Sequence, residues 1–283
     1  MLTTANAAKA RILIYSATRD FRHDSIPTAI EALKAKQDAI NAQFDNTEDQ
    51  TQFTDDNLSG FDTILFLSTT GEVLDQAGKD AFQKYLDLGG TFVGIHSASD
   101  TLRNTTFYIN ELGALFDYHP VLQNFTVDVV DTTHPSTSML PVIWNVQDEA
   151  YNFKSDPRGI GATVILAANE SSYIDTGVHQ NQGTPHPLAW FQEKGAGVES
   201  GGVAGRSFYT SLGHLNETWH ARGISWVLSG NTTRAFNSSG LVGNAQSDIS
   251  GSAQSNSNAP SKTGSTSSTS TTGNSQPANS QVS

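Results

Sequence analysis

The sequence predicts an α/β domain with a parallel sheet and helices on both of its faces, because short apolar strands alternate with helical segments. Residues 11–15, 62–67 and 91–95 are short apolar runs that read as buried parallel strands. A segment with apolar residues at helical spacing follows each of the first two runs. Strands and helices in this alternation form βαβ units with right-handed crossovers, and such units build a parallel sheet.

The two helices between these strands have start and stop signals. Asp24 or Ser25 can cap the first helix, and Pro27 is tolerated in its first turn. The second helix is expected over residues 75–88, where the glycine pair at 89–90 supplies a left-handed stop. The apolar stripe of the first helix consists of Ile26, Ile30, Leu33 and Ile40.

The second half of the chain is expected to contain further strands and one more helix. The stretch from about residue 118 to 192 is rich in turn residues, which favours a small antiparallel extension beside the main sheet. A last helix is expected from a cap at Asn216 through Trp219, Gly223, Trp226 and Val227. The later strands are expected at residues 125–130, 163–167, 188–192 and 207–211.

The chain divides into an N-terminal segment, one domain and a low-complexity tail. Residues 237–283 are almost entirely Ser, Thr, Asn, Gly, Gln, Ala and Pro, so they have too little apolar surface to offset the entropy of ordering them. We expect this tail to be a disordered stalk or linker. Residues 11–236 then form a single α/β domain, preceded by a segment at residues 1–10 without the apolar core of a secretory signal.

Composition excludes several classes of protein. The net charge of −12 and the scattered basic residues argue against a nucleic-acid partner, which needs a basic face. No apolar run reaches the ~18 residues expected of a membrane span. The chain has no cysteine, which excludes disulfides, thiolate nucleophiles and cysteine-ligated metals.

Glycosylation signals indicate an extracellular, secreted protein. Several asparagines begin an N-x-[ST] sequon, the acceptor for N-linked glycans. The Ser/Thr-rich tail resembles an O-glycosylated stalk, a linker to another module, or the stub of a lipid-anchored precursor. The sequons begin at Asn57, Asn104, Asn124, Asn169, Asn216, Asn231 and Asn237.

Three histidines follow predicted strands, at the edge of the sheet where open α/β folds bind ligands. His23 lies beyond the first strand near the start of a helix, His96 follows the strand at 91–95, and His214 follows the strand at 207–211. We expect their imidazoles to lie within about 10 Å of one another, since hydrogen-bond reach with an intervening water or substrate oxygen spans such a gap. If His23 lies at a helix N-terminus, the helix dipole disfavours its charged form.

Seven motifs span about residues 10 to 230 of the chain. In chain order they are FRHDSI (21–26), GGTFVGIHSA (89–98), FDYHP (116–120), THP (133–135), DEAY (148–151), PLAW (187–190) and GRSFYTSLGH (205–214). In these motifs the chain resembles the trehalose-utilisation (ThuA-like) family. One departure is the segment at 194–205, which is longer than the turn usual in the family and could reshape one rim of the pocket.

The resemblance implies the three-layer, flavodoxin-like fold of the class I glutamine amidotransferases. On that scaffold a catalytic cysteine lies at a strand-to-helix elbow and a histidine follows a later strand. His96 and His214 are similar in position to these two residues. An imidazole cannot form the thioester that glutaminase chemistry needs, so the resemblance implies no glutaminase activity. The family's link to trehalose utilisation implies a carbohydrate substrate.

Three functions agree with these residues. In the first, the protein cleaves or isomerises a disaccharide, keto-sugar or polysaccharide by acid–base catalysis, with His96, His214 and Glu149 as catalytic residues. In the second, His23, His96 and His214 bind Zn²⁺ or a similar divalent cation in a hydrolase or lyase. In the third, the domain is a non-catalytic carbohydrate-binding module. The side chains expected to contact the sugar are His23, Asp100, His119, Tyr151 and Trp190.

Overall fold

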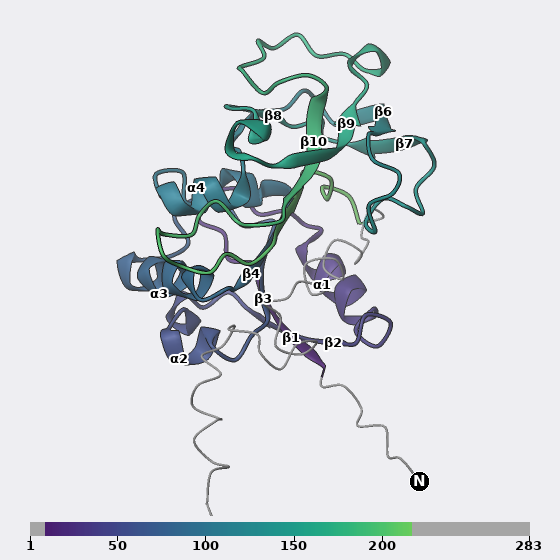
Figure 1. Ribbon diagram of the computed structural model, residues 1–283. Coiled ribbons are helices and arrows are strands. Elements are labelled where there is room, and N and C mark those ends of the chain that lie inside the picture. The colour runs from purple at the N-terminus through teal and green to yellow at the C-terminus, as the bar shows by residue number, and fades with distance from the viewer. Residues whose placement is uncertain (1–8, 217–283) are drawn as a thin grey trace, which may run out of the picture. The chain divides into compact units, whose positions relative to one another are not determined.

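A computed structural model describes residues 9–216 of the chain. Within this range the strands form one nine-stranded sheet, in the order β2-β1-β3-β4-β11-β10-β9-β6-β7, and a separate pair, β5-β8 (Figure 1). The strands of the large sheet are β1 (Ala10–Tyr15), β2 (Ala42–Thr47), β3 (Thr63–Leu67), β4 (Thr91–Ile95), β6 (Gln123–Val129), β7 (Ile143–Asp148), β9 (Thr163–Ala168), β10 (His186–Gln192) and β11 (Ser207–Thr210). The small pair consists of β5 (Phe116–Tyr118) and β8 (Asn152–Phe153).

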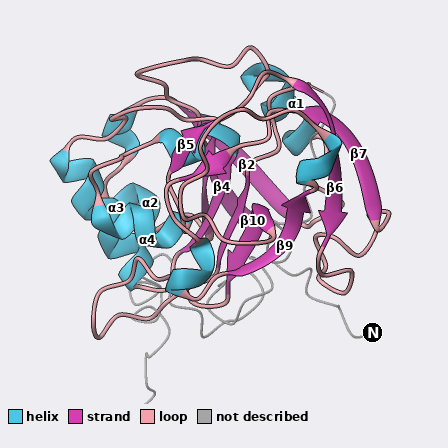
Figure 2. Cartoon of the chain, turned by 90° about the horizontal axis from the view of Figure 1, so that it is seen from above, coloured by secondary structure: helices cyan, strands magenta, loops and turns pink. Residues whose placement is uncertain are grey.

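Helices cover both faces of the large sheet, which confirms the predicted α/β class. Figure 2 shows the strands between α1 on one side and α2, α3 and α4 on the other. The α-helices are α1 (Ile26–Lys34), α2 (Asp55–Leu58), α3 (Gln76–Asp87) and α4 (Thr106–Leu112). Short 3₁₀ helices are η1 (Gln50–Gln52), η2 (His96–Asp100), η3 (Pro157–Ile160) and η4 (Glu170–Ser172).

Alternate residues of each strand face the two helical layers. In β1, Ile12 belongs to the buried cluster that contains Leu33 of α1. The next residue, Leu13, belongs to the cluster that contains Phe82 of α3. Burial of each such side chain stabilises the fold by roughly 1.5–3 kcal/mol. The three-layer arrangement therefore follows from a strand that is apolar on both faces.

The sheet has a parallel half and an antiparallel half. From β2 to β11 all neighbouring strands are parallel, whereas β10, β9, β6 and β7 pair antiparallel with their neighbours. Leu67 aligns with Ile95, and Ile95 aligns with Thr210, so β3, β4 and β11 end together. The residues that follow these strands are thereby brought to one edge of the sheet. The predicted antiparallel extension is present and continues the same sheet.

Most predicted elements agree with the structure, and the differences lie at the edges. Asp75 caps α3 by accepting from the Gly78 N–H at 2.8 Å, and Gly89 beyond its end has a φ of 91°. The first helix was expected to extend to Ile40 but ends at Lys34, and Ser25 occupies its N-cap position without a side-chain cap bond. Strands β2, β5, β7 and β8 and the short helices α2 and α4 were not predicted. The last helix lies, apart from its cap, outside the described residues, as does the tail.

Candidate functional site

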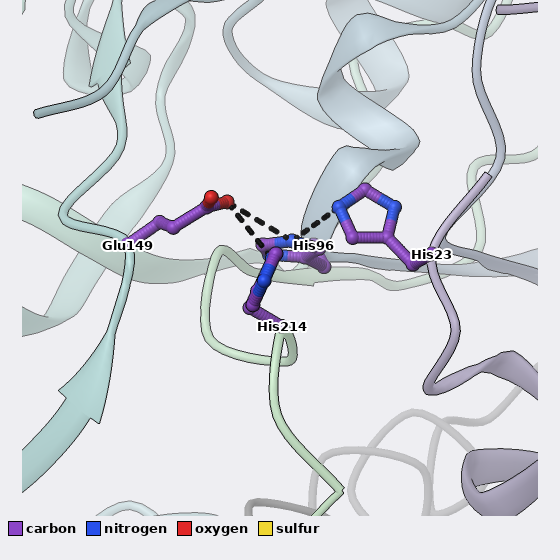
Figure 3. A group of neighbouring side chains, drawn as sticks. All are labelled: His23, His96, Glu149 and His214. Carbon is purple, nitrogen blue, oxygen red and sulfur yellow. Dashed lines mark hydrogen bonds and ion pairs between the residues drawn. The ribbon is translucent and has the colours of Figure 1, made fainter. Parts of the chain in front are cut away.

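The three histidines from the strand ends meet in one cluster (Figure 3). His23 lies in the loop between β1 and α1, His96 directly follows β4, and His214 follows β11. The ring centroids of His23 and His96 are 4.5 Å apart, those of His23 and His214 5.2 Å, and those of His96 and His214 5.6 Å. All three separations are well inside the expected limit of about 10 Å.

Glu149 completes the cluster from the antiparallel half of the sheet. It directly follows β7, and its Oε2 lies 3.1 Å from His214 Nδ1 and 3.6 Å from His96 Nε2. One ring nitrogen from each of the three histidines and one Glu149 oxygen all lie within 4.8 Å of one another. The cluster therefore joins side chains that are far apart in the sequence and come from both halves of the sheet.

His96 lies at a tight elbow between β4 and η2. Its φ of 55° is left-handed, a conformation that is uncommon outside glycine and concentrates at functional sites. His96 Nδ1 donates to the Ser211 carbonyl oxygen at 2.6 Å, which leaves the lone pair of the neutral ring on Nε2. That nitrogen lies 3.0 Å from both His23 Nε2 and the Tyr151 hydroxyl.

Burial sets the protonation state of two of the histidines. Burial and the neighbouring imidazoles lower the pKa of His23 to about 4 and hold the pKa of His96 well below its usual value. A low pKa was expected for His23 from a helix dipole, but burial is the largest cause. The contact with Glu149 instead raises the pKa of His214. His96 is fully buried.

A pocket of about 230 Å³ opens beside this cluster. Its aromatic walls come from Phe21, Phe116 and Tyr151, and the rings of Phe116 and Tyr151 are 4.6 Å apart. Phe21 is 66% exposed at the mouth. Sequence reasoning missed the two phenylalanines, although each lies within three residues of a singled-out histidine. The remaining lining residues are His23, Thr70, Ser97, Asp100, His119 and Glu149.

Two predicted contact residues, His119 and Asp100, line this pocket. His119 Nδ1 lies 2.8 Å from the Pro120 carbonyl oxygen, so Nδ1 donates and Nε2 is free to accept in the neutral ring. Its Nε2 lies 3.5 Å from Glu149 Oε1. The two oxygens of Asp100 accept from Arg103 at 2.6 and 2.7 Å. Asp100 is therefore held in an ion pair.

Two expectations about the site are wrong. Trp190 was expected to contact substrate, but it is 1% exposed, and its indole N–H donates to the Leu112 carbonyl oxygen at 2.7 Å. It packs in the core 4.4 Å from the Tyr209 ring. The segment at 194–205 was expected at the pocket rim. It precedes β11, at the opposite end of that strand from His214, where Gln83 of α3 donates to its Gly197 carbonyl oxygen.

None of the five predicted sequon asparagines within residues 9–216 lines the pocket. Asn104, Asn124 and Asn216 are exposed, and Asn57 and Asn169 are half-buried. Asn231 and Asn237 lie outside the described residues.

Within residues 9–216, no helix combines the length and the apolar character that a membrane crossing needs.

The model of the ThuA family, described as trehalose utilisation, matches residues 11–232. This chain belongs to the ThuA family. Its fold is similar to that of a ThuA-like protein from Bacteroides uniformis, with 22% identity and a TM-score of 0.57 over 84% of this chain and 97% of the other. A ThuA-like protein from Parabacteroides merdae has 17% identity and a TM-score of 0.59 over 78% of this chain and 91% of the other. At these identities the likeness concerns the fold. No curated protein matches the sequence.

In this ThuA chain the His/Glu cluster fits a divalent metal by its donor set. Imidazole nitrogens and a carboxylate oxygen are ligands of zinc and of related first-row metals. Ligand atoms that share a zinc ion lie roughly 3.4 Å apart, and neighbouring pairs here lie 3.0, 3.1 and 3.6 Å apart. His214 Nδ1 is buried and has no hydrogen-bond partner of good alignment. The group could therefore hold a metal ion.

Proposed function

We propose that this ThuA protein is a metal-dependent carbohydrate-active enzyme that removes a proton beside a sugar carbonyl, leading to elimination or isomerisation. The observation that supports this most directly is the set of four ligand atoms within 4.8 Å of one another, next to an aromatic pocket. The family's link to trehalose utilisation supports a carbohydrate substrate. The side chains of the pocket support the type of reaction.

His23, His96, His214 and Glu149 would hold the metal. A divalent cation at this place supplies Lewis-acid chemistry, which polarises a carbonyl and acidifies the neighbouring C–H. The protein's part is to keep the donors deprotonated and in place. Burial favours the neutral, ligating forms of His23 and His96. The bond from His96 Nδ1 to the Ser211 carbonyl oxygen fixes the tautomer in which Nε2 is the ligand.

His119 and Tyr151 would move the protons. Both line the pocket, and their rings stack 5.6 Å apart at an angle of 19°. The His119 bond to the Pro120 carbonyl leaves Nε2 as a base that can accept the proton beside the carbonyl. The Tyr151 phenol can donate a proton to the departing or developing oxygen. The His119 side chain is 34% exposed, so it can exchange its proton with solvent.

Glycoside hydrolysis by a carboxylate pair has less support. That mechanism needs two carboxyl groups free to act as acid and base or nucleophile. Among the residues that line the pocket, the carboxylates are Glu149 and Asp100. Glu149 contacts two histidines of the cluster, and Asp100 is paired with Arg103. Proton transfer by an imidazole and a phenol therefore suits the pocket better.

The pocket is suited to one sugar ring. Its volume of about 230 Å³ is below the roughly 300–1,000 Å³ of sites for drug-sized ligands. Aromatic faces such as those of Phe116 and Phe21 suit the apolar face of a pyranose, while Thr70 and Ser97 offer hydroxyls. We propose small glycosides and chain ends as substrates, rather than internal units of a polymer.

Exposed sequons at Asn104 and Asn124 support export of the protein.

A metal-free proton relay is the second candidate, and the hydrogen-bond chain favours it. His23 Nε2 lies 3.0 Å from His96 Nε2, and His23 Nδ1 lies 3.3 Å from the Ser97 hydroxyl. With a proton on His23 Nε2, these contacts form a continuous chain from Ser97 through His23 to His96. In this mechanism the imidazoles transfer the protons themselves.

A chelation experiment tests the proposal. Purified protein is analysed for bound metals and assayed on keto-glycosides, disaccharides and polysaccharides, before and after a chelator and after return of Zn²⁺, Mn²⁺ or Ni²⁺. We expect activity on a keto-sugar glycoside that is lost with the metal and restored on its return. Full activity after complete removal of metal would favour the relay. A protein that binds sugar without turnover in every metal state would be a binding module.

A further inference from the structure

One turn contacts every segment that contributes to the His/Glu cluster. This turn, residues 211–214, follows β11 and ends in His214. Its Ser211 carbonyl oxygen accepts from His96, and its Gly213 carbonyl oxygen accepts from the Ser25 hydroxyl at 3.3 Å, two residues beyond His23. The position of the turn therefore affects His96, His214 and the segment that contains His23.

Asp148 links this turn to the fourth member of the cluster. Its Oδ2 accepts from the Gly213 N–H at 3.0 Å, and its Oδ1 accepts from the His214 N–H at 3.3 Å. Oδ1 also accepts from the N–H of the adjacent Glu149 at 2.8 Å. Asp148 is fully buried, so these bonds are shielded from water.

We propose that Asp148 is the positioning residue of the site, fixing Glu149 and His214 relative to each other. It does not reach the pocket, and its carboxylate contacts the backbone of both residues. Among the described residues, no backbone hydrogen bond joins the segment of Glu149 to the turn, and the other contact between them is the ion pair of Glu149 Oε2 with His214 Nδ1. This inference rests on the proposed function for its consequence, which is metal affinity.

The chemistry of the bonds explains why a carboxylate is needed at residue 148. Three N–H donors converge on its two oxygens, and a carboxylate is an acceptor at both. An asparagine would direct an NH₂ group at one of these N–H groups. Gly213 contributes as well, because its φ of 155° is a conformation that L side chains rarely adopt. Asp148→Asn and Gly213→Ala are therefore two independent ways to displace the turn.

The test compares the metal affinity of Asp148→Asn with that of the wild type, by calorimetric titration of Zn²⁺ into metal-free protein. We expect affinity to fall 10–100-fold, as for outer-shell partners of metal ligands. The control is Asp62→Asn, because Asp62 is also buried and accepts a backbone N–H, from Arg11 at 2.8 Å, at the other end of the sheet. It should lower the melting temperature and leave affinity unchanged. If Asp148→Asn does not fold, Gly213→Ala takes its place with the same expectation.

Wild-type affinity in a folded Asp148→Asn variant would overturn the inference and leave the proposed function intact. A wild type that binds no metal would contradict the proposed function instead. In that case crystal structures of the variants decide about Asp148. We expect Glu149 Oε2 and His214 Nδ1, 3.1 Å apart in the wild type, to separate in Asp148→Asn. An unchanged distance would overturn the positioning role.

Discussion

Replacing Tyr151 with phenylalanine should abolish most activity without affecting metal content. The change removes only the hydroxyl that lies 3.0 Å from His96 Nε2. The ring keeps its contacts with His96 and Phe116, each at 4.6 Å between centroids. Loss of one hydrogen bond costs about 1 kcal/mol of stability, which lowers the melting temperature by roughly 2–4 °C in a domain of this size.

Loss of a general acid slows catalysis far more than it affects folding. We expect kcat to fall by roughly 10²- to 10⁴-fold, which is about 3–5 kcal/mol of barrier. The assay is steady-state kinetics on the keto-sugar substrate, with metal content measured on the same samples. The matched control is Tyr15→Phe, which removes a buried phenol that donates to the Val73 carbonyl oxygen at 2.7 Å. Tyr15→Phe should lose similar stability and keep full activity. A Tyr151→Phe enzyme with wild-type kcat would refute the assignment of Tyr151 as the acid.

Three further predictions concern stability and export. Glu111 is fully buried, and burial raises its pKa from 4.5 to about 8. Because the carboxyl group loses its proton at lower pH in the unfolded protein than in the folded one, the free energy of unfolding should fall by a few kcal/mol between pH 4.5 and 8. Chemical denaturation at a series of pH values should show a smaller fall for Glu111→Gln than for the wild type. An equal fall in both proteins would contradict this. Trp190→Phe should lower the melting temperature by several degrees, because core packing and the indole hydrogen bond are lost, and should leave KM unchanged. A raised KM would indicate that Trp190 contacts the substrate. Expression in a eukaryotic secretory host should attach N-glycans at the exposed Asn104 and Asn124, and enzymatic deglycosylation that leaves the mass unchanged would contradict export.

The parallel half of the fold was predictable because its strands are apolar on both faces. β1, β3 and β4 are continuous apolar runs, and the rule that ligands bind beyond strand ends located His23, His96 and His214. Strands β2 and β7 were missed because both lie at sheet edges and contain exposed residues at several positions. Neither has the continuous apolar run that marked the other strands.

The remaining site residues depend on tertiary contacts that the sequence does not display. Trp190 was misplaced because the sequence does not say which neighbours an aromatic residue in a strand meets. Glu149 was predicted as a catalytic residue, but it follows an edge strand that was not predicted, so only the structure shows which histidines it contacts. Phe21 and Phe116 lie in the motifs shared with the ThuA-like family, close in sequence to His23 and His119. That closeness in sequence could have indicated that both phenylalanines line the pocket.

The metal site can be located by anomalous X-ray scattering at the zinc edge, from crystals of the protein loaded with one equivalent of Zn²⁺. We expect one strong peak among His23, His96, His214 and Glu149, within bonding distance of all four side chains. Crystals of a His96→Asn variant, prepared in the same way, should lack this peak. A zinc peak elsewhere, or full catalytic activity in crystals and solution with no ion among these four residues, would contradict the proposed metal site.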